Sequence, residues 1–237
     1  MVIAGIVAGG LGSRMGNSSI PKQFLEIDKK PIIIHTIEKF LASAEIDAVV
    51  IGVHMEWKDY LNDLIKKYLN DEKCVTVTEG GTHRNGTIYN IIEQAKKIWN
   101  VDQETIFVTH DAVRPFVSLK IIEENIKMAK KHGICDTVIV ATDTIISSSN
   151  QEYITDIPLR DEMYQGQTPQ SFKYSLFEEV YSSMSEEELS MVTDACKMFF
   201  LRKHDVYLVE GSVLNFKITY AFDFKMAKIM LEETAND

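Results

Sequence analysis

The chain has 237 residues, of which 45% are hydrophobic and 25% are charged, and this composition excludes disordered and low-complexity proteins. Its 25 lysines and arginines against 35 aspartates and glutamates give a formal net charge of −10, which argues against general binding to nucleic acids or anionic membranes. This length suits one large α/β domain, and we expect residues 1–237 to form a single domain.

The cysteines and the N-terminus indicate a cellular compartment. Cys74, Cys135 and Cys196 stand far apart in no metal-binding pattern, which predicts reduced and mostly buried thiols. The N-terminus has no basic region and no cleavage site, and no apolar run approaches the roughly 20 residues that span a bilayer. We therefore expect a cytoplasmic protein with no membrane partner and no nucleic-acid partner.

Short apolar segments alternate with longer amphipathic ones along the chain. The predicted strands are Val2–Val7, Ala48–Val53, Cys74–Thr78, Thr105–Thr109, Asp136–Ala141 and Val206–Val209. The predicted helices are Ile32–Leu41, Glu56–Tyr68, Asn85–Trp99, Leu119–Lys131, Tyr174–Ser182 and Asp223–Glu233. The repeated order of strand and helix predicts an α/β fold, a three-layer αβα sandwich with a Rossmann-like, mostly parallel sheet.

Residues 143–172 interrupt this alternation. They hold two short β-like segments, Thr144–Ile146 and Tyr153–Ile157, around a polar turn. One interpretation is a protruding β-arm that meets another subunit and serves dimerisation. The other is an ordinary surface hairpin.

A glycine-rich segment, residues 9–16, follows the first predicted strand. It is not a dinucleotide-binding fingerprint, because Met15 stands where the third glycine would be. It is not a P-loop either, because Leu11 and not lysine follows Gly10. Glycine lets backbone N–H groups approach phosphate oxygens closely, so the segment still suits a phosphate site.

Two cations accompany this segment. Arg14 lies four residues beyond Gly10, and Lys22 follows Arg14 by eight. Fixed cations beside exposed amides suit a triphosphate and the charge that develops as pyrophosphate leaves. The alternative is a strand-to-loop turn with two solvated cations.

Three further segments follow predicted strands. Residues 80–87 stand between a strand and a helix, where amides and a hydroxyl could read a base edge or simply cap the helix. Asp111 follows the fourth strand, where ligands of open α/β sheets bind, and it suits Mg²⁺, although Arg114 could instead neutralise it. Lys217 stands between Phe216 and Ile218, and it could reach a phosphate.

Together these segments resemble the cytidylyltransferase family, which makes CDP-activated sugar alcohols. The resemblance rests on AGGLGSRMG, PKQFL, GGTHRNGT, HDAVRP, GQTPQSF, TDACK and EGSVLNFKIT, in that order. The family includes the 2-C-methyl-D-erythritol 4-phosphate enzymes of isoprenoid synthesis. HTIEKF, TDTI and YITDIP resemble the ribitol-5-phosphate branch of teichoic-acid synthesis more closely, and Gly9 and Val113, each where the isoprenoid enzymes carry Ala, favour the same branch. Thr82 stands where the isoprenoid enzymes usually carry Asp.

The resemblance implies roles for individual residues. Arg14, Lys22, Arg160 and Lys217 would be catalytic, and Asp111, Arg114, Thr144 and Thr168 would lie near the second substrate, with Asp111 also near the metal. The nucleotide would be bound by Val7, Ala8, Gly9, Gly10, Gly81, Thr82, His83, Arg84, Asn85, Gly86, Thr87 and Ala112. Arg160 and Thr168 would come from the arm of the neighbouring subunit, which implies a homodimer with arm exchange.

We therefore expect a cytidylyltransferase that converts CTP and D-ribitol 5-phosphate to CDP-ribitol and pyrophosphate for cell-wall polymer synthesis. Mg²⁺ or another divalent cation is the expected cofactor, and a dehydrogenase that supplies ribitol 5-phosphate is an expected functional partner. The nearest alternative replaces the alcohol with 2-C-methyl-D-erythritol 4-phosphate. A remote alternative is a nucleotide-binding scaffold without catalysis.

Overall fold

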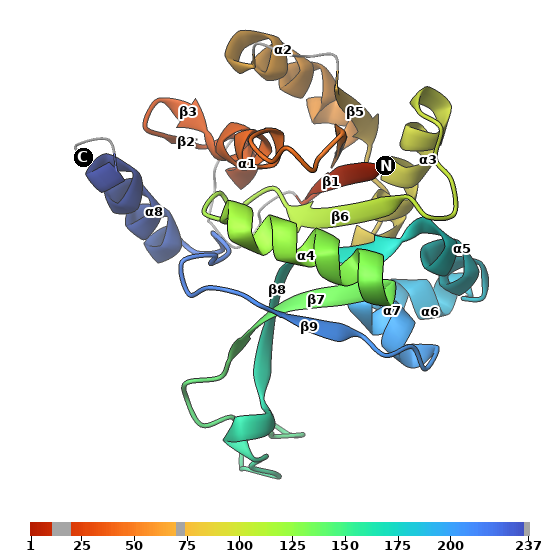
Figure 1. Ribbon diagram of the computed structural model, residues 1–237. Helices are drawn as coiled ribbons and strands as arrows, with labels where there is room; N and C mark the ends of the chain where they lie inside the picture. Colours follow the sequence, from red (N-terminus) through yellow and green to blue (C-terminus); the bar gives the residue numbers. More distant parts are fainter. Residues whose placement is uncertain (11–19, 70–73, 235–237) are drawn as a thin grey trace.

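The computed structural model describes residues 1–10, 20–69 and 74–234. At its centre lies a seven-stranded sheet in the order β5-β4-β1-β6-β8-β7-β9 (Figure 1). Its strands are β1 (Val2–Ala8), β4 (Ala48–Val53), β5 (Val75–Glu79), β6 (Ile106–Asp111), β7 (Ile134–Val140), β8 (Tyr164–Lys173) and β9 (Tyr207–Glu210). Neighbouring strands are parallel except at β8, which runs antiparallel to both β6 and β7.

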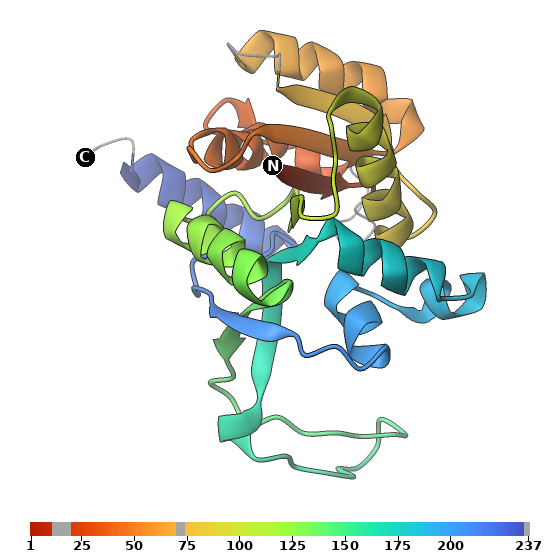
Figure 2. The ribbon, with the colours of Figure 1, turned by 45° about the vertical axis from the view of Figure 1, so that its right-hand side comes forward.

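Helices cover both faces of the sheet (Figures 1 and 2). One face carries α1 (Ile32–Leu41), α2 (Lys58–Tyr68) and α4 (Leu119–His132). The other carries α3 (Arg84–Ile98), α5 (Tyr174–Ser182), α6 (Glu186–Met191) and α7 (Ala195–Leu201). The remaining elements are α8 (Ala221–Thr234), the small β2–β3 pair (Glu26–Ile27 and Lys30–Pro31), and the 3₁₀ turns η2 (Lys22–Phe24), η3 (Met55–Trp57) and η4 (Arg160–Glu162). The predicted three-layer α/β sandwich is confirmed.

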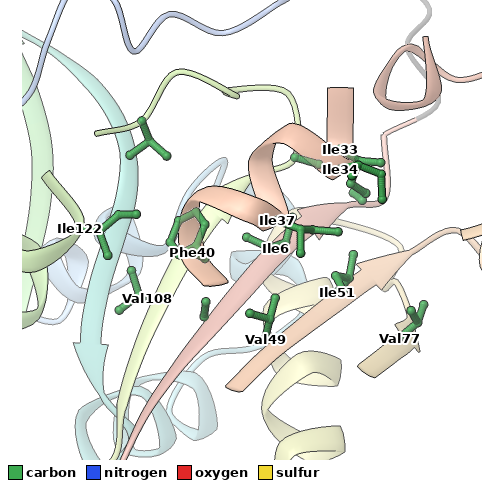
Figure 3. Packing of buried hydrophobic residues seen from close by; sticks show 14 of the residues in the cluster. Ile6, Ile33, Ile34, Ile37, Phe40, Val49, Ile51, Val77, Val108 and Ile122 are labelled. Atoms are coloured by element: carbon green, nitrogen blue, oxygen red, sulfur yellow. The ribbon is translucent and has the colours of Figure 1, made fainter. Parts of the chain in front are cut away.

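The central strands are buried on both faces. Figure 3 shows Ile6, Val49 and Ile51 of the sheet facing Ile34 and Ile37 of α1. Because successive side chains of a strand point to opposite faces, their neighbours in sequence pack against the helices of the other face. This double burial is the reason why the strands are continuous apolar runs in the sequence.

Strand β8 is not among the predicted strands, because the sequence pattern places residues 143–172 in the arm. Residues Tyr164–Lys173 instead form a strand in the middle of the sheet. The buried residues of this strand are mostly polar, and their side chains have hydrogen-bond partners. The Thr168 hydroxyl lies 2.9 Å from His110 Nδ1, and Ser171 donates to Asn125 Oδ1 at 3.1 Å. Buried polar groups with such partners are tolerated, but they hide a strand from a reading of hydrophobic pattern.

The segment between β7 and β8 projects away from the sheet (Figures 1 and 2). We call residues 141–163 the arm. Thr144–Ile146 and Tyr153–Ile157 are not strands, and the two sides of the arm meet in a single isolated bridge, Ser147 to Asp156. A two-stranded hairpin with no third strand or covered face is only marginally stable in water, which explains this loose pairing. Its use in dimerisation stays a prediction.

Two smaller expectations concern the thiols and the membrane. The three cysteines are unbridged, with Cys135 and Cys196 buried and Cys74 partly so. In the described part of the chain, no helix combines the length and the apolar character needed to cross a bilayer.

Candidate active site

A pocket of about 380 Å³ opens beyond the carboxyl ends of β1 and β6 and beside the start of α3. This is the edge at which open α/β sheets bind their ligands. The pocket is lined by Val7, Ala8, Gly9, Gly10, Lys22, Gln23, Gly81, Thr82, His83, Arg84, Thr87, Asp111, Ala112, Val113 and Lys217. Most of the expected nucleotide-binding residues therefore lie together around one cavity.

The first wall is the end of β1 and the two glycines after it. Gln23 Nε2 donates to the carbonyls of Ala8 at 2.8 Å and Gly10 at 3.0 Å, and so fixes the path of this segment. No described heavy atom lies within 4 Å of where a Cβ of Gly10 would stand. The backbone at Gly10 is therefore open on the side where a side chain would otherwise project. Arg14, expected next to it, lies outside the described residues.

The second wall is the start of α3. His83 caps this helix, because its Nδ1 accepts from the Gly86 N–H at 3.1 Å. Gly81 N donates to Thr87 Oγ1 at 3.0 Å. A Cβ at Gly81 would lie 2.5 Å from the backbone carbon of Gly86, so only glycine lets residues 80–81 lie against the helix start. A capped helix N-terminus and close backbone suit an anionic ligand.

The third wall holds a carboxylate surrounded by cations. Lys217 Nζ lies 2.9 Å from Asp111 Oδ2. Arg114 Nε lies 3.5 Å from the same oxygen, and Arg84 Nε lies 3.5 Å from Oδ1. Lys217, Arg84 and Asp111 line the pocket, whereas Arg114 is buried behind Asp111.

These charges decide the ionisation of Asp111. Burial by itself would raise the pKa of Asp111, but the charges of Arg84, Lys217 and Arg114 outweigh it and hold that pKa well below its usual range. Asp111 is therefore a carboxylate at neutral pH. The pairing also keeps several cations together in a protein whose net charge is −10.

Lys22 joins this group from another part of the chain. Its Nζ donates to the carbonyl of Ile218 at 2.9 Å, one residue after Lys217. The two lysines expected to be catalytic thus lie in one pocket, although 196 positions separate Lys22 from Ile218.

Behind the pocket, Thr168 supports the backbone of Asp111. Its hydroxyl accepts from the Asp111 N–H at 3.2 Å and lies 2.9 Å from His110 Nδ1. The other ring nitrogen of His110 is 3.0 Å from the carbonyl of Arg114, which can only accept, so Nε2 carries the proton and Nδ1 accepts from Thr168. Burial lowers the pKa of His110 to about 4, and the ring is neutral.

Several expected residues lie elsewhere. Asn85 is fully buried and donates to the carbonyls of Val192 and Asp194, because this side of α3 faces the α6–α7 connection and not the pocket. Gly86 and Arg114 also do not line the pocket. Thr168 belongs to β8 and bonds to its own chain, so the expectation that it comes from a neighbour's arm is wrong.

Thr144 and Arg160 are on the arm and exposed to solvent. Neither lines the pocket of its own chain. The expectation that Arg160 acts in the site of a second subunit needs that subunit, and it stays a prediction.

Several uncharged residues that shape the site were not among those predicted from the sequence. Gln23 holds the backbone at Ala8 and Gly10, and Gln170 accepts from Arg84 NH1 at 3.0 Å while its Nε2 donates to Asp136 at 3.1 Å. Asn215 accepts from Arg114 through its carbonyl at 2.7 Å. In the sequence, only their position points to these residues, because each stands within a few residues of an expected site residue.

The side chains around the pocket decide how the expected Mg²⁺ could be bound. Within the described ranges, no group of three or more His, Cys, Asp or Glu side chains could hold a metal ion. Asp111 is the one carboxylate among the described lining residues. Mg²⁺ in proteins is commonly held by one or two carboxylates with substrate phosphates and water, so a single ionised Asp111 fits a metal that arrives with a nucleotide.

Comparison with known proteins identifies the relatives of this chain. Residues 2–233 match the family described as 2-C-methyl-D-erythritol 4-phosphate cytidylyltransferase (IspD). The 4-diphosphocytidyl-2C-methyl-D-erythritol synthase of Anaerococcus prevotii is 27% identical with a TM-score of 0.77, over 98% of this chain and 96% of that one. The cytidylyltransferases of Francisella tularensis (24% identity, TM-score 0.77, 96% and 98% covered) and Thermus thermophilus (21%, 0.71, 97% and 98%) share the fold.

These findings agree with the resemblance to the cytidylyltransferases, but they favour its isoprenoid branch. The narrower expectation of a ribitol-5-phosphate enzyme finds no support among them. The match extends over nearly all of the chain, from β1 to α8. The chain belongs to the 2-C-methyl-D-erythritol 4-phosphate cytidylyltransferase family.

Proposed function

We propose that the protein transfers the cytidylyl group of CTP to 2-C-methyl-D-erythritol 4-phosphate and releases pyrophosphate. The family match supports both substrates. The observation that carries the proposal is the pocket, which joins a glycine segment, a capped helix start, two lysines and one ionised carboxylate. That combination suits a nucleoside triphosphate and a second anionic reactant.

The reaction needs no nucleophile from the protein. A phosphate oxygen of the sugar alcohol attacks the α-phosphorus of CTP, a new P–O bond forms, and the bond to the bridging oxygen breaks as pyrophosphate takes the electron pair. Both reactants are anions, and two unit charges about 4 Å apart repel by roughly 4 kcal/mol at an effective dielectric near 20. Lys22 and Lys217 offset this repulsion and stabilise the charge that develops on the leaving group.

Mg²⁺ would be held by Asp111 together with phosphate oxygens of the bound nucleotide. When bound, the metal neutralises phosphate charge and polarises the α-phosphorus. The chain's own residues do the remaining work: the glycine segment and the start of α3 bind and orient CTP, and the lysines hold its phosphates.

D-Ribitol 5-phosphate is the second candidate for the alcohol. It is favoured by Gly9 and Val113, which line the pocket and stand where the isoprenoid enzymes carry Ala. Either substrate would present a phosphate at the end of a short polyol chain, so the same mechanism serves both.

We also propose that the active enzyme is a homodimer. The arm exposes apolar side chains, including Ile154 and Leu159 at 53% and 70% of their full accessible surface. Such a surface favours contact with a second copy. In that dimer Arg160 and Thr144 of one chain would approach the second substrate in the pocket of the other.

A pyrophosphate-release assay tests the proposal. Purified protein is incubated with CTP and Mg²⁺ and with either alditol phosphate, with UTP in place of CTP as a nucleotide control and Lys217→Ala as a protein control. Fastest release with CTP and 2-C-methyl-D-erythritol 4-phosphate supports the main proposal, and fastest release with ribitol 5-phosphate supports the second candidate. Release with neither, while CTP still binds, would favour the non-catalytic scaffold.

A further inference from the structure

Asn215 lies in the loop between β9 and α8, two residues before Lys217. It is fully buried and does not line the pocket. Its side-chain Nδ2 donates to the carbonyl of Thr168 at 2.8 Å and to Gln167 Oε1 at 3.1 Å. Its own main-chain carbonyl accepts from Arg114 NH1 at 2.7 Å. One residue thus links the loop that carries Lys217 to β8 and to Arg114.

The orientation of the Asn215 amide follows from its partners. The Thr168 carbonyl can only accept, so the Asn215 group facing it must be the NH₂. Gln167 is fixed in the same way, because its Nε2 donates to the Ser212 carbonyl at 2.9 Å, which leaves Oε1 to accept from Asn215. Both amides therefore have one orientation, anchored by main-chain carbonyls.

The loop is built closely around this pair of amides. Gly211 leaves no room for a side chain, since a Cβ there would lie 2.5 Å from Gln167 Oε1 and 3.1 Å from the Val138 carbonyl. Ser212 N also donates to Gln167 Oε1 at 3.4 Å. The path of the chain is thereby fixed up to Asn215, and Lys217 follows two residues later.

We propose that Asn215 is a positioning residue, which holds Lys217 and Arg114 at the Asp111 carboxylate without touching substrate. Lys217 and Arg114 both lie against Asp111 Oδ2, at 2.9 and 3.5 Å. Asn215 is joined to Lys217 by two peptide bonds, and its main-chain carbonyl accepts a hydrogen bond from Arg114. The assignment rests on the proposed function, because it concerns the site of that reaction.

A double-mutant cycle separates positioning from general stability. Asn215→Ala, Lys217→Ala and the double variant are compared for kcat in the pyrophosphate assay and for CTP affinity by calorimetry. We expect Asn215→Ala alone to lower kcat about 10- to 100-fold, as loss of a supporting hydrogen bond commonly does. In the Lys217→Ala background the same change should cost less than about threefold, since the group that Asn215 holds is already gone.

The matched control is Asn125→Ala. Like Asn215, Asn125 is fully buried and does not line the pocket, but it donates to the Ile121 carbonyl and to Thr137 Oγ1 and not to Gln167 or Thr168. It should reduce the thermal midpoint, and its effect on kcat should be the same with or without Lys217. If Asn215→Ala behaved like Asn125→Ala, with equal effects in both backgrounds, Asn215 would be no more than a core residue.

A second variant covers failure to fold. Gln167→Met keeps the side-chain length, removes the acceptor for Asn215 and leaves Asn215 in place. Gln167→Met should lower kcat less than Asn215→Ala does, and its effect on kcat should also shrink in the Lys217→Ala background. An effect on kcat that is equal in both backgrounds would again overturn the proposal. Should the wild type release no pyrophosphate with either alditol phosphate, the proposed function fails, while the cycle on CTP affinity still tests the role of Asn215.

Discussion

Lys217 Nζ lies 2.9 Å from Asp111 Oδ2, so the loop before α8 is tied to the end of β6 by one ion pair. Asp111 also pairs with Arg84 and Arg114. The carboxylate thus serves as the counter-ion of the cations in the ligand-free protein. Under the proposed function, phosphates that enter the pocket would meet these cations already assembled. Preorganised charge of this kind makes the largest contribution to transition-state stabilisation in many enzymes.

Replacing Lys22 by methionine tests this arrangement. The change keeps the buried stem but removes the ammonium that donates to Ile218, and we expect kcat to fall about 10²- to 10³-fold, the loss typical of one preorganised donor. Steady-state kinetics with CTP measures it. Lys30→Met is the control, because Lys30 pairs with Glu38 outside the pocket. Unchanged turnover in folded Lys22→Met would remove Lys22 from the mechanism.

The glycines of the first two pocket walls, Gly10 and Gly81, should respond differently to alanine. Gly81→Ala forces a Cβ to within 2.5 Å of the Gly86 backbone, so both the thermal midpoint and CTP affinity should fall. Gly10→Ala meets no described atom within 4 Å, so it should leave the midpoint unchanged and weaken only CTP binding. Thermal unfolding and calorimetry on the two variants check this contrast. Equal midpoints would mean that residues 80–81 do not need to lie against α3.

Asp136 should make stability depend on pH near neutrality. Burial raises its pKa to about 7, against a hydrogen bond from Gln170 and with support from the charge of Asp194. The unfolded carboxyl titrates near 3.9, so the folded state binds the extra proton between about pH 4 and 7, and stability falls as pH rises through that window. The slope is at most about 1.4 kcal/mol per pH unit.

Asp136→Asn removes that titration. In urea denaturation the variant should differ from the wild type least at pH 4.5 and be the more stable protein by a wider margin at pH 8. Gln170, which donates to Asp136, also accepts from Arg84, so CTP affinity at pH 8 reports whether the gain leaves the pocket intact. A difference between the two proteins that stayed constant with pH would contradict the raised pKa.

The sequence predicted those parts of the fold in which local pattern and burial agree. The segments Ile32–Leu41, Ala48–Val53 and Tyr174–Ser182 form the expected elements with the expected ends. Strand β8 was not predicted, because its buried side chains are polar and their hydrogen-bond partners lie on distant segments. A hydrophobic pattern does not identify a buried polar side chain whose hydrogen-bond partner lies on a distant segment, so it does not predict such a strand.

The same reasoning explains what was predicted of the site. Glycines, lysines and Asp111 at the ends of strands were found, because topology alone brings such ends together. Asn85 was misplaced, since adjacent helical residues face different directions and the resemblance gave only a sequence position. Asn215 and Gln23 were not predicted, because the hydrogen bonds that give them a role are made with backbone carbonyls, and the residue types in a sequence do not show such partners.

Arg160 tests whether sites are shared between subunits. It is exposed on the arm and absent from the pocket of its own chain. If it reaches a second subunit, Arg160→Ala should raise KM for the alditol phosphate at least about tenfold and leave KM for CTP within about twofold, because the lost charge meets only the second anion. Steady-state kinetics with each substrate varied in turn measures the split.

Mixing variants then identifies the subunit in which Arg160 acts. Arg160→Ala and Lys22→Met are each defective, but a mixed dimer has one pocket with its own Lys22 and an intact arm from its partner. Co-refolding equal amounts should therefore restore activity toward the statistical share of that one pocket, about a quarter of the wild type for random pairing. Activity equal to the mean of the two parents would mean that Arg160 serves its own chain, since no mixed dimer would then gain an intact site.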